Sequence, residues 1–198
     1  GGGSSDAATV LLALNRLWGL DLPRAQLQAL ALRLGADVPV FVFGQTAFAE
    51  GVGEQLTPVA VPPAWYVVLT PPVEVSTASI FSAPELTRNT PPLRIAAFSA
   101  GTGHTALHGL QSIDSRSPLV GHNDLEPVVV RRYPEVARHL AWLAQFGEAR
   151  MTGSGACVFA SFATEAEAQD VLGRLPESMQ GFVAQGLDRH PLYDFCAG

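Results

Sequence analysis

The sequence predicts an α+β fold, because helical and strand patterns are interleaved and the later strands are joined by short turns. A periodic apolar stripe over residues 7–18 indicates an amphipathic helix. Residues 65–69 indicate a buried strand, and residues 149–162 indicate two antiparallel strands around a glycine turn. The length of 198 residues permits one large core or two small domains.

The first sixty residues are expected to hold helices and one hairpin. Residues 4–6 (Ser-Ser-Asp) are helix-capping types in front of the first stripe, which Gly19 ends. A second helix is expected over 23–34, and a third short element begins at Asp37. Residues 46–59 are predicted to form a hairpin that turns at two glycines.

The remaining elements alternate between strands and helices. The predicted strands are at 65–69, within 149–162 and at 182–187, and the predicted helices are at 76–81, 123–146 and 164–175. Thr164 and Glu167 have the spacing of a capping box. Residues 91–121 are rich in Gly, Ser, Thr and Pro, which predicts a long, mobile surface loop.

Composition excludes several classes of function. The formal net charge of -6 argues against a basic face for nucleic acid. No apolar run is long enough to span a membrane and no secretion signal opens the chain, so we expect a cytoplasmic protein. All twelve cationic side chains are arginine, which excludes a phosphate loop that depends on lysine. Cys157 and Cys196 have neither zinc-site nor disulfide-framework spacing.

The chain opens with a glycine run that leads into the first helix. Glycines allow close approach to a phosphate, and the free N–H groups at a helix N-terminus bind anions. The run consists of Gly1, Gly2, Gly3, Ser4 and Ser5, which are candidate ATP-binding residues. The hydroxyls of Ser4 and Ser5 are candidate Mg²⁺ ligands, and no other metal ligand is assigned. Taken alone, the run is as consistent with a flexible linker as with a phosphate site.

Asp37 is the candidate general base. It lies between apolar residues, where a buried carboxylate without a partner is costly, and a general base contributes roughly 10²–10⁴ in rate. The structural alternative is that Asp37 only caps the turn that contains Pro39.

Two further groups of residues have both a functional and a structural interpretation. The turn made of Thr152, Gly153, Ser154 and Gly155 is suited to close backbone approach to a ligand, or is an ordinary hairpin turn. Thr77 and Phe81 are one helical turn apart and could grip a base; spacing alone favours Phe81 as a core residue. His104 and His108 lack a third ligand, so metal binding is not expected. Arg131, Arg132 and Arg138 are interpreted as a solvated helix face.

These segments, in this order, resemble the GHMP kinases, a superfamily that includes galactokinase and the homoserine and mevalonate kinases. The matching stretches are 1–8, 34–39, 47–54, 123–124 and 151–159, and they cover the chain apart from about 91–121. The Gly-Ala-Asp-Val-Pro and Ala-Glu-Gly-x-Gly-Glu stretches are similar to the branch that phosphorylates diphosphocytidyl-methylerythritol.

The resemblance implies a two-domain α+β fold, with the end of an N-terminal ATP-binding domain at 1–52 and a C-terminal domain at 53–198. It implies that residues 1–5 wrap the ATP phosphates and that Asp37 activates the substrate hydroxyl. Thr77 and Phe81 would line the cytidine site, and the 152–155 turn would pack against the phosphate loop.

The implied reaction is phosphoryl transfer from ATP, with Mg²⁺, to the 2-hydroxyl of a small-molecule substrate in non-mevalonate isoprenoid synthesis. The family lysine and cytidine-stacking tyrosine would lie upstream of Gly1, so this chain alone is expected to be an inactive portion of the enzyme. The alternatives are another GHMP kinase, such as a homoserine or mevalonate-pathway kinase, a nucleotide-binding module without catalysis, and a structural domain that carries a linker.

Overall fold

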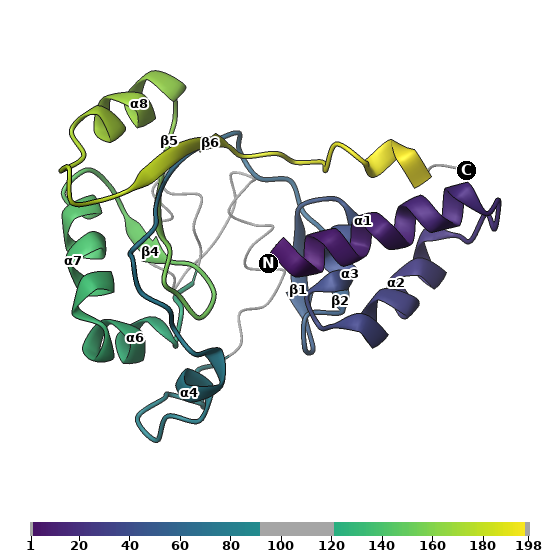
Figure 1. Ribbon diagram of the computed structural model, residues 1–198, viewed down its shortest axis with the longest axis horizontal. Coiled ribbons are helices and arrows are strands. Elements are labelled where there is room, and N and C mark those ends of the chain that lie inside the picture. The colour runs from purple at the N-terminus through teal and green to yellow at the C-terminus, as the bar shows by residue number, and fades with distance from the viewer. Residues whose placement is uncertain (1, 92–120, 197–198) are drawn as a thin grey trace, which may run out of the picture. The chain divides into compact units, whose positions relative to one another are not determined.

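The computed structural model describes residues 2–91 and 121–196, which form two compact units (Figure 1). Unit 1 comprises Gly1–Val61 and Leu187–Gly198, and unit 2 comprises Pro62–Gly186. Most of the predicted loop at 91–121, with His104 and His108, lies outside the described residues.

Three helices form the core of unit 1. They are α1 (Gly2–Leu17), α2 (Arg24–Leu34) and α3 (Val38–Phe43). The buried side chains that they share are Ala8, Leu12, Leu27, Ala31, Val38 and Val42. Helix α1 begins at Gly2, so Gly2 and Gly3 are helical and the predicted cap at residues 4–6 lies inside the helix. The first two helices were predicted, although α1 starts earlier than expected, and α3 lies where only a third short element was expected.

The predicted hairpin is present as β1 (Ala47–Glu50) and β2 (Gln55–Pro58), an antiparallel pair. Its turn depends on Gly51, which has a φ of 72°. The carboxylate of Glu54 folds back and accepts a hydrogen bond from the N–H of Val52 at 2.7 Å. The Glu54 backbone N–H and that of Val52 lower the pKa of this carboxyl group below its usual value. A Cβ on Gly51 would lie 2.5 Å from Glu54 Oε1, so the Gly-x-Gly-Glu spacing has a local structural cause.

The end of the chain returns to unit 1, which the sequence did not predict. The short 3-10 helix η1 (Tyr193–Cys196) contacts α1 and the first residue of α2, Arg24, whose Nη2 donates to the Tyr193 carbonyl at 2.6 Å. Arg24 Nη1 also donates to the Val42 carbonyl at 2.6 Å. Gln45 Nε2 donates to Tyr193 Oη at 2.6 Å. These contacts join the two chain segments of unit 1.

Unit 2 is built on a four-stranded antiparallel sheet. Its strands are β3 (Trp65–Leu69), β4 (Ala149–Met151), β5 (Val158–Phe162) and β6 (Gly181–Gln185), in the order β4-β5-β3-β6. Val67 on the central strand β3 pairs with Ala160 on one side and with Val183 on the other. Val67 and Ala160 are fully buried, so this register puts one face of the sheet in the core.

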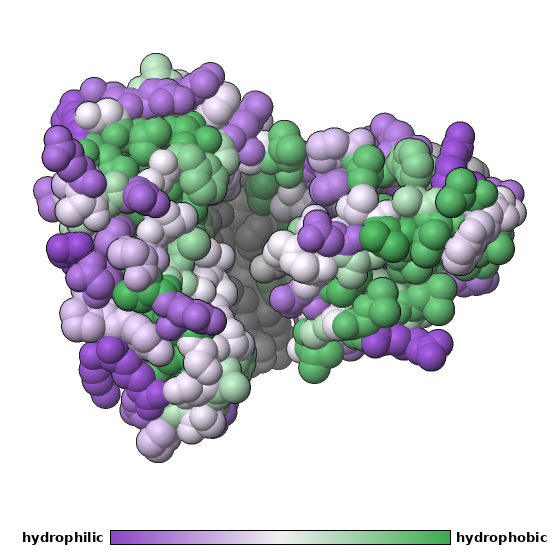
Figure 2. Space-filling model, in the orientation of Figure 1, coloured by the Kyte–Doolittle hydropathy of each residue, from purple (hydrophilic) through white to green (hydrophobic). Residues whose placement is uncertain are grey.

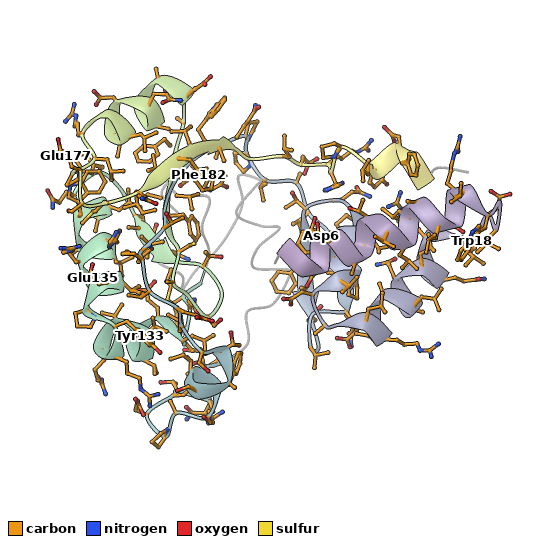
Figure 3. The ribbon with its side chains drawn as sticks, viewed as in Figure 1. Asp6, Trp18, Tyr133, Glu135, Glu177 and Phe182 are labelled. Atoms are coloured by element: carbon orange, nitrogen blue, oxygen red, sulfur yellow. The ribbon has the colours of Figure 1, made fainter. Side chains whose placement is uncertain are left out.

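Among the described residues of unit 2, the helices that accompany this sheet are α4 (Thr77–Phe81), α6 (Glu126–Arg132), α7 (Pro134–Leu143) and α8 (Glu165–Gly173). The predicted single helix at 123–146 was wrong, because the chain breaks at Tyr133 (φ -124°, ψ 89°). A residue before proline is displaced from helical geometry, and Pro134 follows. Figure 3 shows Tyr133 close to α6 and α7. The capping box of α8 is confirmed at Thr164 and Glu167.

The compact units do not coincide with the domains expected at 1–52 and 53–198. The division lies between Val61 and Pro62, because β2 pairs with β1 and stays in unit 1. Residues 187–198 also belong to unit 1, where the Thr46 N–H donates to the Asp188 carbonyl at 2.9 Å. The expected family-domain boundary stays a prediction.

Helices α1 and α2 also expose large apolar side chains (Figure 2). The apolar stripe predicted over 7–18 is therefore only partly buried: Ala8 and Leu12 are in the core, whereas Trp18 is 63% exposed. Other exposed members of this surface are Val10, Leu17, Leu20, Leu32 and Leu34. Within the described ranges, no helix is long and apolar enough to cross a bilayer.

Candidate active site

Four of the predicted ATP-binding residues, Gly2 to Ser5, occupy the first turn of α1, and Gly1 lies outside the described residues. The first four N–H groups of an α-helix have no partner within the helix, so this turn presents free donors. A Cβ built on Gly2 or Gly3 meets nothing within 4 Å, so the space around these two residues is open. The turn is held to the next one by Thr9 Oγ1, which donates to the Ser5 carbonyl at 2.9 Å. Open space and free donors suit an anion.

Asp37 precedes α3 and has an exposed side chain. It makes no side-chain capping hydrogen bond, so the capping interpretation is not supported by a contact of its carboxylate. The burial penalty expected from its apolar neighbours does not arise either, because those neighbours, Val38 and Pro39, are buried and Asp37 is not. Its backbone is thus fixed by the core, and its carboxylate stays available to a ligand.

The hairpin turn of unit 1 lies next to the segment that carries Asp37. A Cβ on Gly53 would lie 3.8 Å from the carbonyl oxygen of Ala36. The two stretches that resemble the kinase family, 34–39 and 47–54, are therefore neighbours in unit 1.

In unit 2, the Thr152–Gly155 turn is a tight loop between β4 and β5. The Thr152 N–H donates to the Cys157 carbonyl at 3.0 Å, and the Gly155 N–H donates to the Thr152 carbonyl at 3.0 Å. Gly153 and Gly155 have positive φ values of 56° and 90°. Gly155 has no room for a side chain, since a Cβ would lie 3.0 Å from Met151 Sδ. Both glycines of the turn are therefore required by the backbone geometry, whether or not the turn binds a ligand.

Asn123, which precedes α6, and Glu126, its first residue, hold this turn and the strand end before it. Only part of this role was predicted. Asn123 was expected to begin the helix; its Oδ1 accepts from the Leu125 N–H at 3.0 Å. Its Nδ2 also donates to the carbonyls of Met151 (3.1 Å) and Gly153 (2.8 Å). Glu126 Oε2 accepts from the Met151 N–H at 2.7 Å. The signal available was the polar Asn-Asp-Leu-Glu run at a helix start.

The structure brings Thr77 to the same turn, although 77 residues separate the two in sequence. Thr77 Oγ1 and Ser154 Oγ are 2.8 Å apart and share a hydrogen bond. Phe81, on the same helix, is 53% exposed, so its interpretation as a simple core residue was wrong. The core member of α4 is Ile80, which is fully buried. Two predicted groups of site residues are thus in direct contact in unit 2.

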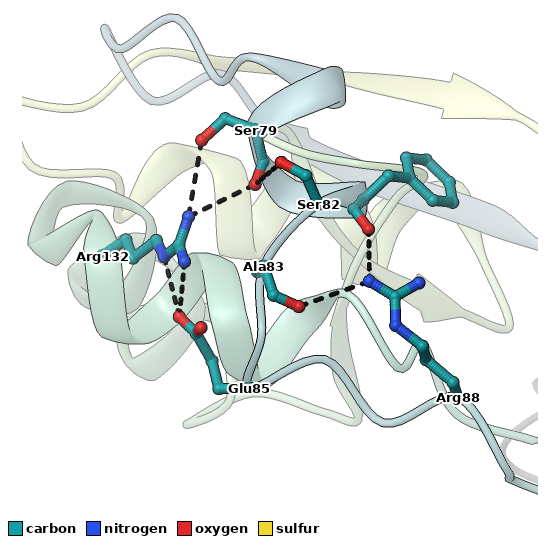
Figure 4. A network of polar contacts seen from close by, with 7 residues as sticks. Ser79, Ser82, Ala83, Glu85, Arg88 and Arg132 are labelled. Atoms are coloured by element: carbon teal, nitrogen blue, oxygen red, sulfur yellow. Dashed lines mark hydrogen bonds and ion pairs between the residues drawn. The ribbon is translucent and has the colours of Figure 1, made fainter.

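Arg132 does not lie on a purely solvated face, contrary to expectation. Its Nε donates to Glu85 Oε1 at 2.8 Å, and its Nη1 donates to the Ser79 carbonyl at 3.3 Å (Figure 4). Arg131 is exposed as predicted, and Arg138 is an exposed side chain that pairs with Glu135 at 2.6 Å. Periodicity could not separate Arg132 from Arg131, because both end the same helix.

The site residues therefore form two groups, one in each unit. Residues 2–5 and Asp37 belong to unit 1, and Thr77, Phe81 and the Thr152–Gly155 turn belong to unit 2. Among residues 2–91 and 121–196, no cluster of three His, Cys, Asp or Glu side chains could hold a metal. The roles of these residues in binding and catalysis stay predictions.

Several curated proteins with similar sequences carry the same name. The chain is 74% identical over 195 residues to "4-diphosphocytidyl-2-C-methyl-D-erythritol kinase" of Thiobacillus denitrificans, covering 98% of this chain and 64% of that protein. It is 63% identical to the protein of the same name from Nitrosospira multiformis, covering 98% of this chain and 61% of the relative. The chain thus spans less than two thirds of the length of these relatives.

A solved structure of similar fold has a corresponding name. The crystal structure of a 4-(cytidine 5'-diphospho)-2C-methyl-D-erythritol kinase matches with a TM-score of 0.72 and 33% sequence identity. The match covers 93% of this chain and 65% of the solved one. The model of the GHMP kinases N terminal domain matches residues 1–45, and that of the GHMP kinases C terminal region matches residues 106–181. With both family models matched in order, and a solved kinase of the same α+β architecture, the chain belongs to the GHMP kinase family.

Proposed function

We propose that this protein transfers the γ-phosphoryl group of ATP to the 2-hydroxyl of 4-diphosphocytidyl-2-C-methyl-D-erythritol. The observation that carries the proposal is the 74% identity, over 98% of this chain, to a relative named for that activity. The contact between Thr77 and the Thr152–Gly155 turn supports it, because residues expected at the cytidine and phosphate sides lie together.

The first turn of α1 would hold the ATP phosphates. Its free N–H groups point along the helix axis, where the helix dipole also favours an anion. Mg²⁺, when bound with ATP, would neutralise phosphate charge, and its protein ligands would be the hydroxyls of Ser4 and Ser5. Hydroxyl oxygens are hard ligands of the type that Mg²⁺ takes, and Ser4 and Ser5 lie in the same first turn of α1 as the free N–H groups.

Asp37 would accept the proton of the substrate hydroxyl. Its carboxylate is exposed and makes no capping bond, so it is free to take a hydrogen bond from a ligand. Phosphoryl transfer depends mainly on positioning and electrostatics, and the base orients the attacking oxygen.

The exposed ring of Phe81 would stack on the cytosine, which is worth about 1–3 kcal/mol per base. Thr77 keeps hydrogen-bonding capacity for the substrate, because a hydroxyl has one donor and two acceptor positions and Ser154 uses one of them.

The direct test is a kinase assay on the protein made from its complete gene, with Asp37→Ala as the variant. We expect turnover to fall by at least about 10²-fold, as for loss of a general base, without a change in melting temperature. Asp170→Ala is the control, since Asp170 is an exposed carboxylate on α8 that pairs with Arg174. Unchanged turnover in Asp37→Ala would remove Asp37 from the mechanism.

A substrate panel tests the choice within the family. We expect phosphorylation of the cytidine-containing substrate and none of homoserine or mevalonate. Turnover of homoserine or mevalonate instead would assign the protein to another branch of the GHMP kinases, and binding of ATP without turnover of any of them would favour a nucleotide-binding module.

A further inference from the structure

Helix α4 carries both residues expected to contact the cytidine, yet it is only five residues long. A helix of this length is not stable by itself in water, so its position must come from contacts with the rest of unit 2. Ile80 is its one buried side chain, and Thr77 and Phe81 project outward. Ala83, two residues after the helix, is buried in the same core. These apolar contacts fix the depth of the segment, and polar contacts at its two ends constrain its rotation and tilt.

Two arginines from outside α4 bind its backbone (Figure 4). Arg132, the last residue of α6, donates from Nη1 to the Ser79 carbonyl at 3.3 Å and to Ser79 Oγ at 3.4 Å. Arg88 Nη2 donates to the Phe81 carbonyl at 2.6 Å and to the Ala83 carbonyl at 3.3 Å. The last carbonyls of a helix lack partners within it and favour cations, so these guanidinium groups lie where the helix end needs them.

Arg132 is itself held by Glu85. Its Nε and Nη2 lie 2.8 and 2.7 Å from Glu85 Oε1, and the two side chains are only 32% and 26% exposed. The Glu85 backbone N–H, with smaller contributions from Arg132 and Arg131, lowers the pKa of this carboxyl group. The backbone that carries Arg132 is also held in place, because Val128 and Val129 of the same helix are buried in the core. The guanidinium therefore has a fixed origin and a fixed orientation.

The other end of α4 is joined to the glycine turn by the bond between Thr77 and Ser154. The helix is thus held at its start by a hydroxyl pair and at its end by two guanidinium groups. A shift at the arginine end would move Phe81 directly, because its own carbonyl is one of the bonded groups.

We propose that Arg132, oriented by Glu85, is a positioning residue that holds α4 so that Phe81 and Thr77 are presented to the cytidine diphosphate part of the substrate. This inference rests on the proposed function and deepens it. Arg88 shares the task at the Phe81 carbonyl. Both arginines act through α4, which carries the residues expected to contact the cytidine. Their effect is therefore on substrate binding and not on the phosphoryl transfer itself.

The test compares Arg132→Ala with Arg138→Ala in the protein made from its complete gene. Arg138 is the matched control, because it pairs with Glu135 within α7, three residues away, and touches no predicted site residue. We expect Arg132→Ala to raise KM for the cytidine substrate by about fivefold to tenfold, as for loss of a partly exposed charged hydrogen bond. KM for ATP and kcat should stay within about twofold, and Arg138→Ala should match the wild type.

Two variants probe the role of the fork geometry and protect against a folding failure. Arg132→Lys keeps the charge but not the planar donor set, so it should recover only part of the substrate affinity. Glu85→Gln removes the charge partner and leaves the arginine in place, so it should produce a smaller KM increase in the same direction. Equal rises in KM for ATP and substrate, or full rescue by lysine, would overturn the positioning role.

Hydrogen exchange supplies a readout that does not depend on catalysis. The amides of Ile80 and Ser82 donate to the Ser76 and Ala78 carbonyls and report the closure of α4. Arg132→Ala should accelerate their exchange and weaken equilibrium binding of cytidine diphosphate, and Arg138→Ala should do neither. Unchanged exchange in Arg132→Ala would refute the inference. If the expected acceleration is seen but the wild-type protein has no kinase activity on the cytidine substrate, only the proposed function is refuted.

Discussion

Replacing Gly155 with alanine tests the reasoning about the Thr152–Gly155 turn. Gly155 has a φ of 90°, and this backbone conformation costs a residue with a side chain about 1–2 kcal/mol. The new Cβ would lie 3.0 Å from Met151 Sδ and 3.4 Å from Val129 Cγ1. Met151 and Val129 are buried, so crowding adds roughly 1–3 kcal/mol. We therefore expect the free energy of unfolding of unit 2 to fall by about 2–5 kcal/mol.

Gly153→Ala is the matched control, because it separates the two contributions. Gly153 has a φ of 56° and nothing within 4 Å of its built Cβ. This variant should lose only the backbone contribution of about 1–2 kcal/mol. The difference between the two variants therefore measures the crowding against Met151 and Val129.

Urea unfolding followed by tryptophan fluorescence provides the measurement. Trp65 and Trp142 both belong to unit 2, and Trp18 belongs to unit 1, so a Trp18→Phe background restricts the signal to unit 2. Linear extrapolation gives the free energy of unfolding for each variant. Equal losses in Gly153→Ala and Gly155→Ala would show that the close packing around Gly155 contributes nothing and would refute the reasoning.

Two further predictions concern unit 1. Arg24→Ala removes donors from the Val42 and Tyr193 carbonyls, so we expect circular dichroism to show a loss of about 2–4 kcal/mol in unfolding free energy. Arg33→Ala, on the same helix and exposed, should change it by less than about 0.5 kcal/mol; equal effects would contradict the role of Arg24. The pKa of Glu54 is lowered on folding, so its stabilising contribution is present above the ordinary value of 4.5 and is lost as pH falls through the lower folded value. Glu54→Gln should therefore lose less stability between about pH 6 and pH 3 than the wild type, and identical pH profiles would contradict this assignment.

Local patterns predicted most of the elements in both units. The strand Trp65–Leu69 was placed at its observed bounds, because apolar and aromatic residues dominate a central strand. The capping box at Thr164 identified the start of α8, since both partners of the box lie within three residues. The contact of Thr77 with the glycine turn was not predicted, since no local pattern joins residues so far apart.

The features that the sequence did not reveal depend on tertiary contacts. The break at Tyr133 had a local cause in Pro134, but the long apolar periodicity on both sides outweighed it in the prediction. Arg132 was assigned to solvent because its partner Glu85 lies 47 residues away. Asp37 was expected among apolar groups, but only its neighbours Val38 and Pro39 are buried in the core, and its own carboxylate is exposed.

The return of residues 187–196 to unit 1 has a consequence for the order of events during synthesis. The ribosome releases all of unit 2 before Tyr193, which lies 169 residues after its partner Arg24, becomes available. Unit 2 is one continuous stretch and can form first, whereas unit 1 also needs residues 187–196, which are made after unit 2. Until then Arg24, Gly44 and Gln45 lack their later partners. We therefore expect the helices of unit 1 to become resistant to proteolysis later than unit 2 in the nascent protein.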